Sequence, residues 1–193
     1  MLRGQDGFTL VEIMISLTVL GILIALGAPG FIEWMQSQRV RATAESITNG
    51  LQVARGEAIR RNLPVVLGLE PPGTAWTVCE ATIAPCDSTT PAGNFIQNKA
   101  AAEASGAAGV TTTSNQPPTA SILVTFSPLG AVLATNADGT PALAKVDVSY
   151  PPNVCSADGG TMRCLRVVVS PAGSVRMCDP TPGIVQPDPR ACP

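Results

Sequence analysis

The stretch Gly7-Phe8-Thr9-Leu10-Val11-Glu12, followed by the uncharged residues 13–32, decides the class of this 193-residue chain. The uncharged part is about 20 residues long. As an α-helix it spans about 30 Å, the thickness of a bilayer's hydrocarbon core. A short polar leader, residues 1–7, precedes it and ends in Gly7. The sequence therefore predicts a membrane-spanning N-terminal helix behind a short leader.

Glu12 places a carboxylate within the first turns of this apolar stretch. An acid at the centre of a membrane helix costs about 2.5–3.5 kcal/mol on insertion scales, so it needs a partner. If the chain is cleaved between Gly7 and Phe8, the new α-amine of Phe8 lies one helical turn from Glu12. In a filament, that amine can neutralise the Glu12 of an adjacent subunit. Two alternatives are an ordinary secretory signal peptide cut near residues 25–28 and a single-pass anchor with an incidental glutamate.

The composition excludes several classes of function. The chain has 12 basic and 14 acidic residues, a net charge of −2, so it is not a broadly basic nucleic-acid binder. It contains no histidine, and its two lysines, Lys99 and Lys145, stand in ordinary surroundings. No nucleophile elbow, phosphate-binding loop or dinucleotide-binding glycine pattern occurs. We therefore expect neither an enzyme nor a cofactor-binding protein.

All six cysteines lie on the C-terminal side of the apolar stretch. An even number of cysteines on one side of a membrane segment indicates disulfides in an oxidising compartment. A metal site is the weaker alternative, because there is no CxxC pair and no histidine. Six cysteines leave fifteen pairings open. We predict that each pairs with its nearest neighbour: Cys79–Cys86, Cys155–Cys164 and Cys178–Cys192.

The predicted helix continues beyond the apolar stretch. Pro29-Gly30 is a predicted kink, because proline removes one helical hydrogen bond and clashes one turn back. Further on, apolar residues recur at spacings of four and three, which predicts one buried stripe against a sheet or a partner helix. Two arginines before Asn62 and Pro64 mark the helix end. The stripe consists of Val40, Ala44, Ile47, Leu51, Ala54 and Ala58.

From residue 65 the pattern changes to short strands joined by Gly- and Pro-rich turns. Residues 127–132 and 170–175 share the design Ser-Pro-x-Gly-x-Val, in which proline and glycine set the two turn angles, so both predict hairpins. Residues 87–120 are rich in Ala, Gly, Ser and Thr and predict a long surface insertion. We expect strands near residues 65–69, 75–79, 122–126, 131–133, 146–150, 163–169 and 174–178.

The sequence thus predicts an α+β chain with three parts. Residues 1–7 form the leader, residues 8–64 the long helix, and residues 65–193 a disulfide-bonded antiparallel β head.

The stretch from Gly7 to Glu12 resembles the class III leader of type IV pilins and type II secretion pseudopilins. Two later segments, Leu51-Gln-Val-Ala-Arg-Gly-Glu-Ala-Ile-Arg-Arg-Asn-Leu-Pro-Val and Cys164-Leu-Arg-Val-Val-Val-Ser-Pro-Ala-Gly-Ser-Val-Arg-Met-Cys178, are similar to the GspH/FimT family of minor pilins and pseudopilins. The resemblance implies cleavage after Gly7 by a prepilin peptidase and N-methylation of Phe8. It also links the proline at position 29 to local unwinding on assembly.

The same resemblance implies where the protein is located and with what it assembles. The chain is expected in the inner membrane as a single-pass protein with a periplasmic β-sandwich-like head, and then in a pilus or pseudopilus, at or near its tip. Its expected partners are other pilins or pseudopilins and the inner-membrane assembly platform. In the secretion setting, a pseudopilin of type H would contact secreted substrates.

DNA binding is the alternative function, since some FimT-like pilins capture DNA through a Gly-Arg-x-Arg turn on the last hairpin. The matching residues here are Gly173-Ser174-Val175-Arg176, so one arginine of that motif is replaced by serine. Arg163 and Arg166 are the other candidate DNA contacts, but strand alternation places these two on opposite faces. A structural subunit is therefore the favoured reading.

Overall fold

The computed structural model describes residues 8–70, 74–81, 86–87, 95–100, 111–114 and 122–193. The chain divides into two compact units, Met1–Gln36 and Ser37–Pro193. A single helix, α1 (Leu10–Arg61), supplies the regular structure of the first unit and continues into the second. The leader, including Gly7, lies outside the described residues.

Helix α1 ends where the sequence indicates. Asn62 adopts a left-handed backbone conformation with φ 55°, which is the usual way to close a helix. Pro64 follows, and β1 begins at Val65. At the other end, Thr9 precedes the first helical residue, and its hydroxyl accepts a hydrogen bond from the Glu12 backbone N–H at 3.3 Å. Thr9 is therefore the N-cap of α1.

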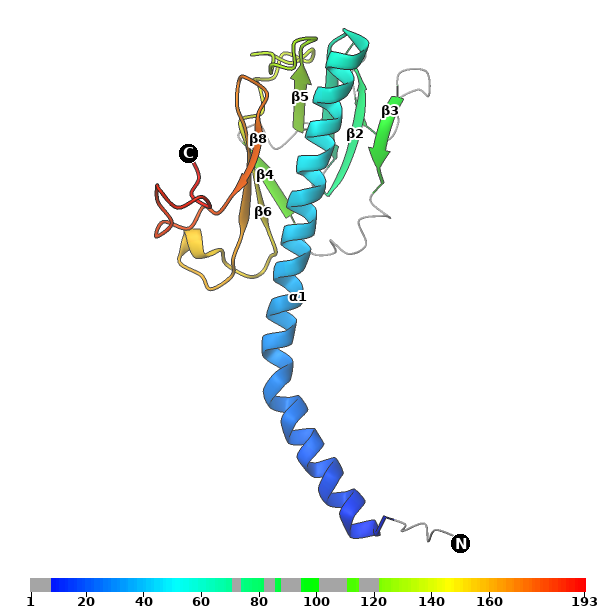
Figure 1. Cartoon of the computed structure of the whole chain (residues 1–193), viewed down its shortest axis with the longest axis vertical. Coiled ribbons are helices and arrows are strands. Elements are labelled where there is room, and N and C mark those ends of the chain that lie inside the picture. The colour runs from blue at the N-terminus through cyan, green and yellow to red at the C-terminus, as the bar shows by residue number, and fades with distance from the viewer. Residues whose placement is uncertain (1–7, 71–73, 82–85, 88–94, 101–110, 115–121) are drawn as a thin grey trace, which may run out of the picture. The chain divides into compact units, whose positions relative to one another are not determined.

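The second unit contains two four-stranded antiparallel sheets (Figure 1). The first has the order β3-β2-β1-β5, and the second the order β4-β6-β7-β8. The strands of the first sheet are β1 (Val65–Glu70), β2 (Ala75–Glu80), β3 (Phe95–Lys99) and β5 (Ile122–Phe126). Those of the second are β4 (Thr111–Ser114), β6 (Lys145–Ser149), β7 (Leu165–Val169) and β8 (Val175–Cys178).

One hydrophobic core joins the second half of α1 to both sheets. The whole predicted stripe of α1, from Val40 to Ala58, is fully buried, so the prediction of a sheet-packing face is confirmed. Each sheet adds inward-facing strand residues, such as Leu67 in β1 and Val167 in β7. Since all residues of this core lie within Ser37–Pro193, the second unit has a core of its own. The predicted α+β fold is confirmed.

The outer face of the first sheet is also covered. The disulfide Cys79–Cys86 and the side chains of Val66 and Leu123 form a second, smaller core there. A Cβ atom on Gly68 would lie only 2.0 Å from the backbone oxygen of Cys86. The chain carrying Cys86 therefore lies directly on β1, and glycine is required at that contact. This double coverage explains why β1 is apolar at nearly every position rather than alternating.

The two Ser-Pro-x-Gly segments form turns, as predicted. In each, the glycine N–H donates a 2.8 Å hydrogen bond to the serine carbonyl, and Gly130 and Gly173 have φ of 76° and 79°. The first does not lead into a regular strand at residues 131–133. Instead, Val132 makes one isolated bridge to Phe126 and donates its N–H to the carbonyl of Pro171, in the other turn.

The expected irregular insertion, residues 87–120, contributes two strands. β3 pairs with β2, and β4 pairs with β6, so both are edge strands of their sheets. Most of the remaining insertion lies outside the described residues. The other departures from prediction are one or two residues at strand ends.

Candidate functional site

The N-terminal part of α1 presents an exposed apolar surface. All side chains between Phe8 and Met35 that the structure describes are exposed. The side chain of Pro29 lies outside the described residues. A window of 18 residues has a mean hydropathy of 2.4, and none of it is buried within the protein. By length and composition, this segment can cross a membrane. An apolar helix of this kind is stable only in lipid or against partner helices.

Glu12 lies in the first turn of this helix and is exposed. A carboxylate in the first turn is favoured by the helix dipole, and Thr9 satisfies the Glu12 backbone N–H. Phe8, which would be the first residue after cleavage, lies just before the helix and has an exposed fraction of 78%. The end of the helix that would carry both the amine and the acid is therefore accessible to a partner.

The backbone stays helical through Pro29 and Gly30. Unwinding at this point on assembly thus remains a prediction about another state of the protein.

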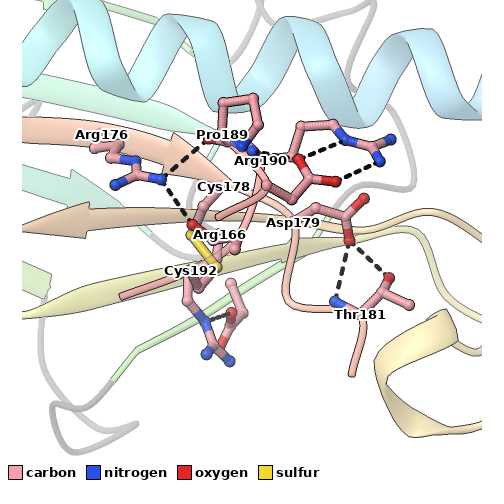
Figure 2. The surroundings of a disulfide bond; sticks show 11 residues. Arg166, Arg176, Cys178, Asp179, Thr181, Pro189, Arg190 and Cys192 are labelled. Carbon is pink, nitrogen blue, oxygen red and sulfur yellow. Dashed lines mark hydrogen bonds and ion pairs between the residues drawn. A yellow bond between two sulfur atoms is a disulfide. The ribbon is translucent and has the colours of Figure 1, made fainter. Parts of the chain in front are cut away.

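The six cysteines form three disulfides, and no described cysteine is free. The bonds join Cys79 to Cys86, Cys155 to Cys164 and Cys178 to Cys192, which is the nearest-neighbour pairing expected from the sequence. Each closes a short loop. The last one holds the C-terminal segment against the end of β8 (Figure 2).

Two of the three candidate DNA-contacting arginines share one face of the second sheet. Arg166 of β7 pairs with Cys178 of β8, and Val168 pairs with Arg176, so Arg166 and Arg176 both point away from the core. Arg166 makes a two-pronged ion pair with Asp147 of β6, at 2.5 and 3.1 Å. Arg176 donates to the carbonyls of Pro189 and Ala191 at 3.0 and 2.8 Å (Figure 2). Both guanidinium groups are thus held by the protein itself.

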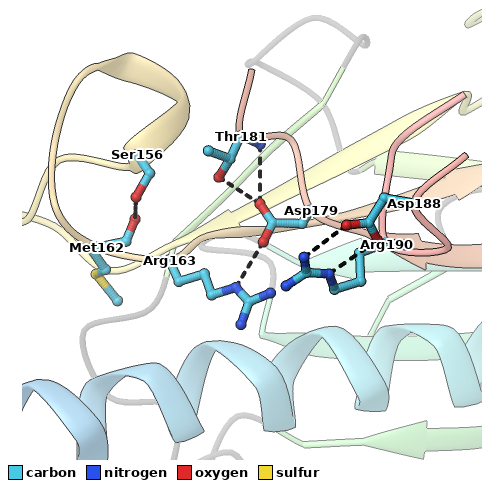
Figure 3. Close-up of polar contacts among 7 residues, drawn as sticks. All are labelled: Ser156, Met162, Arg163, Asp179, Thr181, Asp188 and Arg190. Carbon is cyan, nitrogen blue, oxygen red and sulfur yellow. Dashed lines mark hydrogen bonds and ion pairs between the residues drawn. The ribbon is translucent and has the colours of Figure 1, made fainter. Parts of the chain in front are cut away.

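Arg163 lies apart from these two. It precedes β7, and its Nε donates to the carboxylate of Asp179 at 2.7 Å (Figure 3). Burial opposes ionisation of Asp179, but hydrogen bonds from Thr181 and Arg163 outweigh it and hold the pKa of this carboxyl below its ordinary value. Close by, hydrogen bonds from Arg190 lower the pKa of Asp188 to about 2. Strand alternation predicts Arg163 and Arg166 on opposite faces of one strand, whereas in the structure Arg163 precedes β7, which begins at Leu165.

Sequence reasoning missed the carboxylates that hold these arginines. Asp147 lies directly opposite Arg166 in the β6–β7 ladder, and strand pairing would have revealed this pair if the register had been known. Asp179 and Asp188 sit in the irregular C-terminal segment. No periodic pattern marks residues in such a segment, so only the fold brings them to Arg163 and Arg190.

Comparison with known protein families agrees with this architecture. Residues 43–173, about two thirds of the chain, match the family model described as type II transport protein GspH. The chain belongs to the GspH family. Residues 2–28 match the prokaryotic N-terminal methylation motif, so the leader and the apolar helix also carry a recognised pattern. This member of the GspH family is a type IV pilin-like subunit.

Individual relatives are more distant. Two proteins from Pseudomonas aeruginosa, both described as fimbrial protein, are 31% identical over 78 residues, which is 40% of this chain and 49% of theirs. The chain therefore spans about half the length of the curated relatives it matches. Among solved structures, two crystal forms of the type IV minor pilin FimU of P. aeruginosa align with 18% and 17% identity and TM-scores of 0.48 and 0.45. These alignments cover 75% and 71% of this chain, and 91% and 90% of the FimU chains.

Proposed function

We propose that this protein is a minor, non-catalytic subunit that assembles into, or primes, a type IV pilus or a type II secretion pseudopilus, at or near its tip. Its leader is removed after Gly7 by a prepilin peptidase, and Phe8 is N-methylated. Before assembly the apolar helix is held in the inner membrane, with the disulfide-bonded head in the periplasm.

One observation carries the proposal: the N-terminal part of α1 is apolar and exposed, and its first turn contains one carboxylate, Glu12. In lipid, this carboxylate lacks a counter-charge, and insertion there is costly. In a filament, the α-amine of Phe8 on a neighbouring subunit supplies that charge. The free-energy cost of the unpaired Glu12 carboxylate in lipid then favours assembly, because pairing with the neighbouring amine removes that cost.

Two settings fit this chemistry. The fimbrial-protein relatives support a pilus, and the description of the family model supports a secretion pseudopilus, in which the head would contact secreted substrates. Both settings use the same assembly step at Glu12. DNA capture has less support, because Arg163, Arg166 and Arg176 are each engaged by groups of the protein itself.

Replacing Glu12 tests the assembly step. We expect Glu12→Ala to be processed normally, since the cleavage position at Gly7 and Phe8 is unchanged, but to be depleted from filaments because it cannot pair with a neighbouring amine. The measurement is an immunoblot of sheared filaments against the membrane fraction, with the mobility of the chain reporting leader removal.

Glu33→Ala is the matched control, because it removes a carboxylate from the same helix beyond the uncharged stretch. We expect it to be recovered in filaments at the wild-type level. Normal filament recovery of Glu12→Ala would contradict the charge-pairing step.

A further inference from the structure

The second unit contains a pocket of about 330 Å³ between α1 and the C-terminal segment. Three arginines from distant parts of the sequence line it: Arg41 from α1, Arg163 from the residues before β7, and Arg190 from the C-terminal segment. The wall beside them is apolar and consists of Leu165, Met177 and Pro189. None of these arginines contributes to the outer sheet face that carries Arg166 and Arg176.

Each arginine of the pocket is held from one side by a carboxylate. The ion-pair distances are 2.7 Å for Arg163–Asp179, 2.8 Å for Arg190–Asp188 and 2.8 Å for Arg41–Glu45. Figure 3 shows Arg163 and Arg190 next to each other, each with its carboxylate. Asp179 is almost completely buried, with 2% of its side chain exposed, whereas the side chains of Arg163, Arg190 and Arg41 are 55–63% exposed. The buried acid therefore fixes the guanidinium of Arg163, which remains open to solvent.

Donor groups remain available in the pocket. Arg41 and Arg163 use only Nε for their carboxylates, and within the described part of the chain their terminal nitrogens have no hydrogen-bond partner. A guanidinium presents five N–H groups in a rigid fork that fits a carboxylate. Arg41 and Glu45 form an exposed pair on one helix face, which is a weak interaction that an incoming carboxylate can replace. Two forks with unused donors thus face one pocket.

We propose that this pocket binds an aspartate or glutamate side chain of an adjacent filament subunit, with an apolar neighbour of that residue on the wall formed by Leu165, Met177 and Pro189. This inference rests on the proposed function, because assembly supplies the adjacent subunit. The first pocket residue, Ser37, follows the apolar stretch within a few residues along the chain. When the apolar helices of adjacent subunits pack together in a filament, a neighbouring chain comes close to the residues that directly follow the apolar stretch.

The surrounding charge favours a single carboxylate over a nucleic acid. Residues 65–193 contain nine acidic and six basic residues, and each arginine of the pocket already has a carboxylate beside it. A nucleic acid needs several neutralising cations along its backbone. One carboxylate with an apolar neighbour needs only two guanidinium forks and the apolar wall, which this pocket has.

A photo-cross-linking experiment tests this pocket in the full-length chain. Benzoylphenylalanine replaces Gln38, an exposed residue that lines the pocket, in cells that assemble the filament. We expect an adduct with another filament subunit, at a peptide that contains an aspartate or glutamate. The double variant Arg41→Gln/Arg163→Gln, which removes the two guanidinium groups with unused donors, should still enter filaments but should reduce this adduct at least about tenfold, because charge-assisted hydrogen bonds are lost.

Arg60→Gln is the matched control, because Arg60 is an equally exposed arginine in an ion pair on the same helix, away from the pocket. It should leave the adduct unchanged. If the chain enters filaments but gives no such adduct, or gives one that the double variant does not reduce, the pocket is not the contact, while the proposed function stands. An adduct with nucleic acid also overturns the inference. If the unsubstituted chain never reaches the filament fraction, the proposed function fails, and the inference fails with it.

Discussion

At the scale of single residues, the two repeated turns illustrate how a local pattern and a tertiary contact combine. Gly130 and Gly173 both need a positive φ, which the sequence pattern predicts. The pattern does not predict that the two turns meet. Arg55 of α1 donates to the carbonyl of Gly130 at 3.1 Å, and a Cβ on Gly173 would lie 1.8 Å from that same oxygen. Gly173, the first residue of the candidate DNA-binding turn, is therefore a packing residue.

This contact gives a prediction about stability. We expect Gly173→Ala to destabilise the protein by clearly more than Gly139→Ala, in denaturant unfolding with the disulfides intact. Both glycines have a positive φ, of 79° and 82°, so alanine costs about 1–2 kcal/mol at either position. Only Gly173 also faces a backbone oxygen, since nothing lies within 4 Å of a Cβ on Gly139. Equal losses of stability would show that the turns can separate without cost.

At the scale of elements, the sequence predicts best where one pattern continues for many residues. The stripe from Val40 to Ala58 follows the helical period over five turns, and all of it is buried. β3 and β4 lack such a signal. β4 is only four residues long, Thr-Thr-Thr-Ser, and β3 contains Asn98 and Lys99, which are weak strand formers. These strands form at sheet edges because they pair with β2 and β6. The residues of β3 and β4 themselves do not predict this pairing, because it depends on strands elsewhere in the sequence.

The end of α1 carries a group of ion pairs that should respond to pH. Glu57 accepts hydrogen bonds from Arg60 and Arg61, and these lower its pKa from 4.5 to about 2. A lowered carboxyl pKa means that the folded state favours the ionised form. The resulting stability is present above about pH 4.5 and is lost as the pH falls towards 2.

Glu57→Gln removes this dependence. We expect the variant to be less stable than the wild type at pH 7, and to lose less stability than the wild type between pH 4.5 and pH 2. Denaturant unfolding at a series of pH values measures both effects. Glu45→Gln is the control, because Glu45 forms an exposed pair with Arg41 on the same helix. Parallel acid profiles for wild type and Glu57→Gln would contradict the assignment.

At the scale of the whole molecule, the sequence predicts the parts of the protein better than the sites between them. Residues 7–12 and the apolar stretch are continuous in sequence, so the assembly site at Glu12 could be identified without a structure. The arginine pocket could not be identified in this way. More than a hundred residues separate Arg41 from Arg163 and Arg190 in the sequence. The three arginines meet only after α1, β7 and the C-terminal segment pack together. The two faces of the second sheet likewise depend on the register of β7 and β8.

The charge of the whole molecule leads to the last prediction, on DNA. Residues 65–193 have an excess of three acidic residues, and Arg166 is paired with Asp147. On the outer face of the second sheet, Arg176 then remains as the main phosphate contact, although two backbone carbonyls already hold it. Affinity for duplex DNA falls with salt in proportion to the number of neutralised phosphates, with a log–log slope of about −0.9 for each.

We therefore expect the full-length protein, in non-ionic detergent, to show no measurable binding to duplex DNA at physiological salt. At low salt we expect a log–log slope no steeper than about −2, since on the outer face of the second sheet only Arg166 and Arg176 can contribute. The measurement is fluorescence anisotropy over a salt series, with Arg176→Ala beside Arg60→Ala, an exposed arginine at the far end of α1. A steep slope that Arg176→Ala reduces, and that Arg60→Ala leaves unchanged, would mean that the C-terminal segment releases Arg176 to phosphate. DNA capture would then become the favoured function of the head, while assembly through Glu12 would be unaffected, because the two sites lie in different units of the chain.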